Sequence, residues 1–295
     1  MSITVRLSGG IGNQLHQFAA GVAIAGVKKT NLILDLRTIN LGSNQKRVFE
    51  LDSLDFSKLT VPYSFLGSVS TLRNLIYRFR NKLNLPQSFY LGRNIIQETS
   101  EDPLTQIEKI NDNDEVSGHF VDFNWVYKAE EFGFGPQIKE NILTKEVIAL
   151  KEKVGHDDVA IHMRFGDFLE HPDIFPKIDD DFFQEALSHL PKANHIWIFT
   201  DDLRNATKFC NKTIRKAFKV LGPKELSSIE TFWLFGQFNA MITSNSTFSC
   251  WASYISNQAN PQVITPTPHL LKSWTDSLPN SWIRIPLKLD YTQEM

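Results

Sequence analysis

Apolar positions in the first part of the chain change from a strand pattern to a helix pattern and back. Their spacing predicts, in order, a strand at Ile3–Leu7, a glycine turn at Gly9–Gly12, a helix rich in small residues at Asn13–Val27 and a buried strand at Leu32–Leu36. A strand, a helix and a second strand in this order make a βαβ unit, which requires a parallel sheet with helices on its faces.

A second alternating series follows the charged stretch Lys151–Lys153. It predicts strands at Val159–Met163, Ile196–Thr200, Ala240–Thr243 and Val263–Thr265, and helices at Asp179–Leu190, Leu203–Phe218, Ser228–Phe238 and Ser246–Ile255. The stretch from Asn40 to Thr144 is less regular. We therefore expect an α/β protein with two Rossmann-like lobes, residues 1–150 and 151–295, and a cleft between them.

Composition and charge narrow the classes of partner. The 295 residues are 42% hydrophobic and 22% charged, as in an ordinary globular protein. The 31 basic and 33 acidic residues give a net charge of -2, which does not favour nucleic acid as a partner. Cys210 and Cys250 have no spacing typical of a metal or redox site. The chain opens directly on a strand pattern, and no uncharged apolar run reaches about 18 residues, so we expect a cytoplasmic protein.

One segment has a strongly basic character. No acidic residue occurs between Asp55 and Glu98, and apolar residues recur at helical spacing from Leu72 to Leu83. We favour a helix that packs one face on the core. A docking face for an anionic membrane surface or a lipid-diphosphate acceptor is the alternative.

Four polar motifs lie where a predicted strand ends and a helix begins, which is where open parallel sheets bind ligands. In GGIGN at residues 9–13, glycines let the backbone approach a ligand, although a tight turn without a ligand explains the motif equally well. In HMRFGD at residues 162–167, the guanidinium of Arg164 suits capture of an anion. The structural alternative is an ion pair between Arg164 and Asp167.

The other two motifs are FTDD at residues 199–202 and TSNSTF at residues 243–248. Asp201 and Asp202 can bind hydroxyls or amines of a ligand, or cap the following helix. The hydroxyl-rich residues 243–247 open a helix whose free amides suit phosphate oxygens, and they exceed what one cap needs. A metal site formed by His162, Asp167 and His171 is disfavoured, because Gly166 and Pro172 predict a loop there.

Together these segments resemble the α-1,2-fucosyltransferases of glycosyltransferase family 11, especially the bacterial members. The resemblance is carried by GGIGNQLHQFAAGVAIA at residues 9–25, VAIHMRFGDF at 159–168, IWIFTDD at 196–202, FWLFGQFNAMITSNSTFSCWASYI at 232–255 and PNSWI at 279–283. It implies a GT-B-like fold, GDP-fucose as the donor, inversion at the anomeric carbon, and no metal or other cofactor. The N-terminal lobe would bind the acceptor, and the C-terminal lobe the donor.

The resemblance also implies roles by position. Arg164 would bind the β-phosphate and stabilise the leaving GDP, and His162 would help to hold the nucleotide. Asp167, Glu170 and His171 follow Arg164 closely and are candidates for the catalytic base. The other donor-binding candidates are Gly10, Gly12 and Asn13 at the diphosphate or fucose, Asp201 or Asp202 at the nucleotide, and Ser246, Thr247 and Phe248 at the phosphate and ribose.

Two residues depart from the family pattern. Phe165 stands where the family usually has a second Arg, and Cys250 where it has a second Trp-like residue. Neighbours in a strand face opposite ways, so the missing Arg can be one that serves packing rather than chemistry. The rival functions are transfer from another nucleotide sugar, non-catalytic binding of a nucleotide sugar, and metal-dependent hydrolysis. The expected acceptor is the galactose 2-hydroxyl of an oligosaccharide or lipid-linked bacterial surface glycan, with peripheral contact at the inner face of the plasma membrane.

Overall fold

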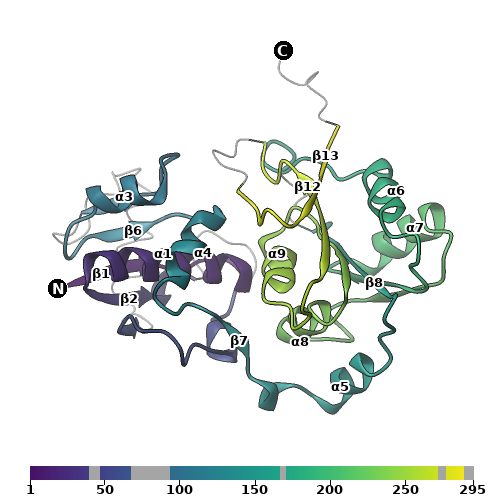
Figure 1. Cartoon of the computed structure of the whole chain (residues 1–295), viewed down its shortest axis with the longest axis horizontal. Coiled ribbons are helices and arrows are strands. Elements are labelled where there is room, and N and C mark those ends of the chain that lie inside the picture. Colours follow the sequence, from purple (N-terminus) through teal and green to yellow (C-terminus); the bar gives the residue numbers. More distant parts are fainter. Residues whose placement is uncertain (40–46, 68–93, 167–170, 272–276, 289–295) are drawn as a thin grey trace. The chain divides into compact units, whose positions relative to one another are not determined.

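The computed structural model describes residues 1–39, 47–67, 94–166, 171–271 and 277–288 (Figure 1). The chain divides into two compact units, Met1–Gln137 and Ile138–Met295, called here the N-terminal and the C-terminal unit. The boundary thus lies at Gln137, whereas the sequence placed it near residue 150. Each unit contains a parallel sheet with helices on its faces, which confirms the predicted α/β class.

In the N-terminal unit, five described strands form a sheet in the order β4-β2-β1-β6-β5, and every described pair is parallel. The predicted βαβ unit is confirmed: Ser2 pairs with Asn31 and Arg6 with Asp35. The strands are β1 (Ser2–Arg6), β2 (Asn31–Asp35), β4 (Tyr63–Leu66), β5 (Ile95–Gln97) and β6 (Glu115–Ser117), with β3 (Leu54–Asp55) and β7 (Gln137–Ile138) as two short additional strands.

Helix α1 (Ile11–Lys28) is almost entirely buried because small residues let it lie close to the sheet. A Cβ atom on Gly21 would lie 2.8 Å from Cδ1 of Leu32, so a larger residue would push the helix away from β2. The helix ends where Lys29 takes the left-handed conformation and donates its N–H to the carbonyl groups of Ala25 and Gly26. Figure 1 shows α1 beside α4 (Phe123–Glu130), against which it packs.

The stretch that the sequence describes as irregular contains several short elements. Strands of three or four residues give no periodic pattern, so β4, β5 and β6 were not predicted. Helices α3 (Pro103–Lys109) and α4 were also missed. The predicted basic helix at Leu72–Leu83 lies outside the described residues.

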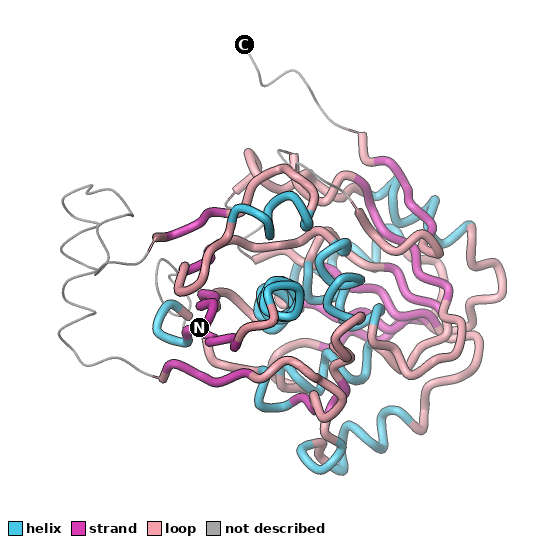
Figure 2. Tube along the Cα trace, turned by 60° about the vertical axis from the view of Figure 1, so that its left-hand side comes forward, coloured by secondary structure: helices cyan, strands magenta, loops and turns pink. Residues whose placement is uncertain are grey.

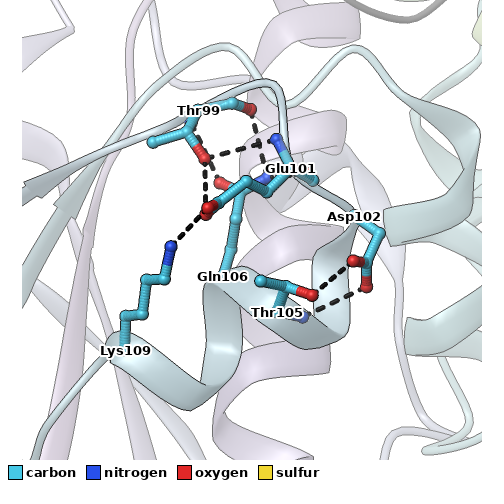
Figure 3. A network of polar contacts seen from close by, with 6 residues as sticks. All are labelled: Thr99, Glu101, Asp102, Thr105, Gln106 and Lys109. Atoms are coloured by element: carbon cyan, nitrogen blue, oxygen red, sulfur yellow. Dashed lines mark hydrogen bonds and ion pairs between the residues drawn. The ribbon is translucent and has the colours of Figure 1, made fainter.

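Helix α3 begins with a dense set of local hydrogen bonds (Figure 3). Asp102 caps it by accepting from the amide of Thr105 at 3.1 Å, and Pro103 follows as its first residue. Gln106 exchanges hydrogen bonds with the backbone of Thr99, and Lys109 pairs with Glu101. Local capping explains why this seven-residue helix starts at Pro103.

In the C-terminal unit, six described strands form a parallel sheet in the order β10-β9-β8-β11-β12-β13. Figure 2 shows strands of this sheet side by side, in magenta. The chain winds from β8 outward to β10 on one side, then returns and winds from β11 outward to β13 on the other. The strands are β8 (Val159–Met163), β9 (Ile196–Thr200), β10 (Phe218–Leu221), β11 (Ala240–Ile242), β12 (Gln262–Thr267) and β13 (Ile283–Pro286). The helices are α5 (Lys145–Lys151), α6 (Asp180–Ser188), α7 (Leu203–Thr213), α8 (Ser228–Phe235) and α9 (Thr247–Tyr254). Among the described residues, short 3-10 helices lie at Leu36–Thr38 and Leu51–Ser53 in the N-terminal unit and at Glu140–Ile142 in the C-terminal unit.

The predicted strands at Val159–Met163 and Ile196–Thr200 are confirmed to the residue. The helix predicted at Leu203–Phe218 was wrong at its end, since α7 stops at Thr213 and Phe218 starts β10. Ile214 is extended and buried, and Phe218 pairs with Ile196 of β9. Pairing with the sheet therefore outweighs helix propensity in this segment.

Candidate functional site

The C-terminal sheet has one position that favours ligand binding. Strands β8 and β11 are neighbours, but the chain leaves them towards opposite sides of the sheet, so their carboxyl ends form a topological switch point. In open α/β sheets, ligands bind outside the carboxyl ends of the strands at such a point. Here β8 ends with His162 and Met163, followed by Arg164, and β11 is followed by Thr243 and Ser244.

His162 connects the two sides of this switch point. Its Nδ1 atom lies 2.8 Å from Oγ of Ser244, and both residues are buried. The ring of Phe248 is stacked on the imidazole, with a centroid distance of 5.3 Å. Burial lowers the pKa of His162 to about 3, and the positive charge of Arg164 acts in the same direction. His162 is therefore a neutral imidazole that joins β8 to the residues leading into α9.

Arg164 is held by Asp201, which directly follows β9. Nη1 of Arg164 lies 3.1 Å from Oδ2 of Asp201. The same carboxylate accepts hydrogen bonds from the amides of Phe165 at 2.9 Å and Gly166 at 3.1 Å. A Cβ atom at Gly166 would lie 2.6 Å from this carboxylate, so a larger residue there would push the carboxylate out of its position. Asp201 thus orients Arg164 and the backbone that follows it.

The side chain of Phe165 is partly buried and packs against the hydrophobic core of the C-terminal unit. The departure from the family pattern at this position therefore affects core packing. Arg164 is the neighbouring residue that keeps its side chain partly exposed and paired with Asp201.

Asp202 caps helix α7. Its carboxylate accepts from the amide of Asn205 at 3.0 Å and from the side-chain amide of Asn205 at 2.7 Å. The backbone hydrogen bond from Asn205 lowers the pKa of Asp202. The sequence left two roles open for the carboxylates of FTDD, ligand binding and helix capping, and the structure shows Asp202 as the helix cap.

Residues 243–248 form the entrance to α9. Ser246 caps the helix and accepts from the amide of Phe248 at 3.4 Å. The preceding polar side chains are buried, and Asn245 donates to the carbonyl oxygen of Pro176 at 3.1 Å. Thr247 and Phe248 are partly exposed. The amides of a first helical turn have no partner within the helix, which makes this end of α9 suitable for an anion.

The glycine motif lies in the N-terminal unit, between β1 and α1. Gly9 has a φ of 74°, and its carbonyl oxygen accepts from Nε2 of Gln14. The first amide of α1, that of Ile11, donates to Oε2 of Glu50 at 2.9 Å. Gly10 is the N-cap, Gly12 is buried and Asn13 is partly buried. A carboxylate of the protein itself therefore accepts from the first amide of the helix end at which the sequence predicted the donor.

The switch point of the N-terminal sheet, between β1 and β6, is filled by the side chain of Gln17. Its Nε2 atom donates to Oγ of Ser8 at 2.8 Å and to the carbonyl oxygen of Gly118 at 3.0 Å, and its Oε1 atom accepts from the amide of Ser8. Gln17 is 1% exposed. No sequence pattern predicted these contacts, because a glutamine inside an apolar helix does not reveal which strand ends its side chain connects.

The candidates for the catalytic base are placed only in part. Asp167 and Glu170 lie outside the described residues. His171 is exposed, and its carbonyl oxygen accepts from the amides of Ile174 and Phe175. The structure thus brings together His162, Arg164, Asp201, Ser246 and Phe248 at the edge of one sheet, while Gly10, Gly12 and Asn13 belong to the other unit.

Two further properties bear on the chemistry. In the described parts of the chain, no three His, Cys, Asp or Glu side chains are grouped so that they could hold a metal ion. None of the described helices is both long and apolar enough to cross a membrane.

Comparison with known proteins supports the resemblance to glycosyltransferase family 11 that the sequence motifs indicated. The profile of glycosyl transferase family 11 matches residues 126–285. An α-1,2-colitosyltransferase of Escherichia coli is 26% identical over 309 residues, covering 97% of this chain and 99% of the relative. The O-antigen biosynthesis glycosyltransferase WbnK of Escherichia coli is 23% identical over 308 residues, covering 95% and 99%.

Two solved structures share the fold. The α-1,6-fucosyltransferase NodZ, known from Bradyrhizobium and soaked with GDP-fucose, has a TM-score of 0.53 at 15% identity, covering 90% of this chain and 95% of NodZ. POFUT1 in complex with GDP has a TM-score of 0.55 at 12% identity, covering 90% and 97%. The predicted GT-B-like α/β fold is thereby confirmed.

Proposed function

This chain belongs to glycosyl transferase family 11, and on that premise we propose that it transfers L-fucose from GDP-fucose to a hydroxyl group of a bacterial surface glycan, with inversion at the anomeric carbon. The observation that carries the proposal is the position of Arg164. Its guanidinium lies at the end of β8, beside the switch point, and is oriented by Asp201. A cation fixed in this way suits a diphosphate better than a flexible surface Lys would.

In the proposed reaction, an oxygen atom of the acceptor attacks the anomeric carbon on the face opposite GDP. The bond from this carbon to the β-phosphate oxygen breaks, and its electron pair stays with GDP. Arg164 and the first turn of α9 would stabilise that negative charge, an effect worth about 10²- to 10³-fold in rate per donor group. The acceptor proton would pass to a base, for which Asp167, Glu170 and His171 remain the candidates.

Within this proposal the C-terminal unit binds the donor and the N-terminal unit binds the acceptor. Two contrasting observations support the division. The switch point of the C-terminal sheet carries Arg164 and the start of α9, whereas that of the N-terminal sheet is filled by Gln17. Ser246, Thr247 and Phe248 would contact the phosphates and ribose, and neutral His162 would hold Phe248 and Ser244 in place.

The donor sugar has one specific alternative. A relative similar over 97% of this chain is an α-1,2-colitosyltransferase, and colitose is fucose without its 3-hydroxyl group. A site that hydrogen-bonds a hydroxyl group strongly rejects an analogue that lacks this group. A site that does not bind the hydroxyl group discriminates only weakly between the two molecules. Use of both sugars would therefore indicate that the 3-hydroxyl group is not bound by the protein.

The test is to incubate the enzyme with GDP-fucose, GDP-colitose, GDP-mannose or UDP-galactose and an excess of β-galactoside acceptor. We expect release of GDP and a new disaccharide, linked to the galactose 2-hydroxyl, with GDP-fucose or GDP-colitose only. Stabilisation by GDP-fucose without product would instead favour a sugar-nucleotide-binding protein. Product from UDP-galactose or GDP-mannose alone would refute the donor assignment.

We further propose that the acceptor is an oligosaccharide or lipid-linked glycan of the O-antigen type, modified in the cytoplasm with peripheral contact at the inner face of the plasma membrane. The O-antigen relative supports the class of acceptor. Sedimentation with vesicles that carry a lipid-linked oligosaccharide, against vesicles without it, tests the contact. Equal recovery in the supernatant with both kinds of vesicle would refute it.

A further inference from the structure

The first turn of α9 is held by polar side chains of β12 and of the residues that follow β11 and β12. If this turn binds a diphosphate, its position relative to Arg164 decides how well the leaving group is stabilised. A displacement of about 1 Å can cost roughly 10² in rate. The side chains that fix α9 are therefore candidates for a role in donor binding even where they touch no ligand.

One side of α9 is held by the contact already described. Oγ of Ser244, the partner of His162, lies 3.5 Å from Oγ of Ser249. Oγ of Ser249 in turn donates to the carbonyl oxygen of Ser246, the N-cap residue, at 3.2 Å. This side was anticipated in part, because both His162 and Ser246 belong to recognised motifs.

The other side is held by a chain of contacts, which we call the Thr243–His269 chain; two of its members, Thr265 and His269, belong to no motif that the sequence analysis identified. Oγ1 of Thr243 donates to Oγ1 of Thr265 at 2.8 Å, and Oγ1 of Thr265 lies 2.9 Å from Nε2 of His269. Nδ1 of His269 lies 3.9 Å from Sγ of Cys250, a residue of α9. Thr243 and Thr265 are fully buried, and Cys250 is 2% exposed.

The hydrogen bonds of this chain suit one tautomer of the imidazole. Thr265 accepts from Thr243, so its own hydroxyl proton is available for Nε2 of His269. In the tautomer that accepts this bond, the ring proton is on Nδ1, which lies towards Cys250. Burial lowers the pKa of His269 to about 4, and the charge of Arg284 adds to the effect, so the ring is neutral at physiological pH.

Two fully buried threonines in a polar row with a partly buried histidine are an unusual way to fill this position. Apolar residues of the same size would pack there without the cost of removing hydroxyl groups from water. A fully connected polar row does, however, specify one geometry more sharply than apolar packing does. The row ends on Cys250, one turn from the helix start that would bind the phosphates.

We propose that His269 is a positioning residue of the donor site, which fixes the first turn of α9 through Cys250 and is itself fixed by Thr243 and Thr265. The inference rests on the proposed function, because it concerns the binding of the donor's diphosphate. His269 does not touch the reacting atoms. Its loss should therefore affect the binding of GDP and GDP-fucose, but not the binding of the acceptor.

The experiment compares His269→Ala, His269→Gln and Thr265→Val with the wild-type enzyme. Binding of GDP is measured by calorimetry, and KM is measured separately for GDP-fucose and for the acceptor. We expect His269→Ala and Thr265→Val to weaken GDP binding and raise the donor KM about tenfold, with the acceptor KM unchanged. His269→Gln should restore most of the loss, because its amide oxygen can accept from Thr265 near the position of Nε2.

Matched controls make the same chemical changes at exposed sites. Thr207→Val removes a hydroxyl that bonds only the carbonyl oxygen of Leu203, and His156→Ala removes an exposed imidazole. Unchanged GDP affinity and donor KM in both His269→Ala and Thr265→Val would overturn the positioning role. If His269→Ala does not fold, the GDP affinity and donor KM of Thr265→Val alone test the positioning role. A wild-type enzyme that binds no GDP would refute the proposed function, and the positioning role with it.

Discussion

Nδ1 of His162 lies 2.8 Å from Oγ of Ser244, and this contact spans the point where the C-terminal sheet reverses its winding. His162 belongs to β8, and Ser244 to the residues between β11 and α9. The proposed phosphate ligands follow closely on both sides: Arg164 two residues after His162, and Ser246 two residues after Ser244. One buried hydrogen bond therefore sets the separation of the two groups that would bind the diphosphate.

Arg164→Ala should abolish transfer while the protein stays folded. The side chain is 20% exposed and forms an ion pair with Asp201, whose carboxylate keeps the amides of Phe165 and Gly166 as partners, so its loss should change the free energy of unfolding by about 1 kcal/mol. Transition-state stabilisation should fall by roughly 3–4 kcal/mol, a loss of about 10²- to 10³-fold in kcat. Steady-state kinetics with GDP-fucose measure this, with Arg204→Ala, on the exposed side of α7, as the matched control. Wild-type turnover by Arg164→Ala would refute the role.

Asp201→Asn should weaken both donor binding and stability, whereas Asp202→Asn should change neither by much. Asp201 accepts from three donors, and an amide has only one oxygen, so at least one of these partly buried or exposed donors loses its partner, at about 1 kcal/mol. Asn is as good a helix cap as Asp, so α7 keeps its start in Asp202→Asn. Thermal unfolding with and without GDP measures both effects. Equal melting temperatures of the two variants, with and without GDP, would contradict the role of Asp201 in orienting Arg164.

The limits of sequence analysis follow from these contacts. The strands at Val159–Met163 and Ile196–Thr200 were predicted because buried parallel strands read as continuous apolar runs. The predicted end of the strand at Met163 also placed Arg164 at the carboxyl end of β8, where the structure has it. Glu50 was missed because it reaches the amide of Ile11 across 39 positions, a separation that no local pattern encodes. His269 was missed for the same reason: its partner Thr265 is near in sequence, but Cys250 is met only in the folded sheet.

Activity should survive the removal of divalent cations. In the described residues no cluster of side chains could hold a metal ion, and Arg164 with the start of α9 would neutralise the leaving diphosphate instead. The measurement compares transfer rates after dialysis against EDTA, with and without added Mg²⁺ or Mn²⁺. Loss of activity in EDTA that Mn²⁺ restores would contradict metal-independent transfer.

Glu50→Gln should leave the start of α1 intact, whereas Glu50→Ala should weaken it. The glutamine oxygen can still accept from the amide of Ile11, but alanine leaves that amide without its partner, a loss of about 1 kcal/mol. Glu108→Ala, at an exposed position of α3, is the control. If the glycine turn also binds the donor, removal of the carboxylate charge in Glu50→Gln should not weaken GDP binding. A fall in GDP affinity in Glu50→Gln would show that the charge itself assists the ligand.

The stability of the protein should fall as the pH is lowered from about 6.5 to 4.5, and His162 should account for part of this fall. Its pKa is about 3 in the folded protein and near 6.5 in the unfolded chain. Between these values the unfolded chain binds more protons, so the free energy of unfolding rises with pH by at most about 1.4 kcal/mol per unit and levels off above pH 6.5. His269, with a pKa of about 4, acts in the same direction.

His162→Asn isolates this contribution. Asn can keep a hydrogen bond to Ser244 from the position of Nδ1, but it does not titrate. The melting temperature of the variant should therefore depend less on pH between 4.5 and 6.5 than that of the wild type. The raised pKa of Glu98 gives a pH dependence of the opposite sign, but it is common to both proteins and cancels in the difference. Parallel curves for the two proteins would mean that His162 can be protonated in the folded state, and a charged His162 would then face the diphosphate as a second cation beside Arg164.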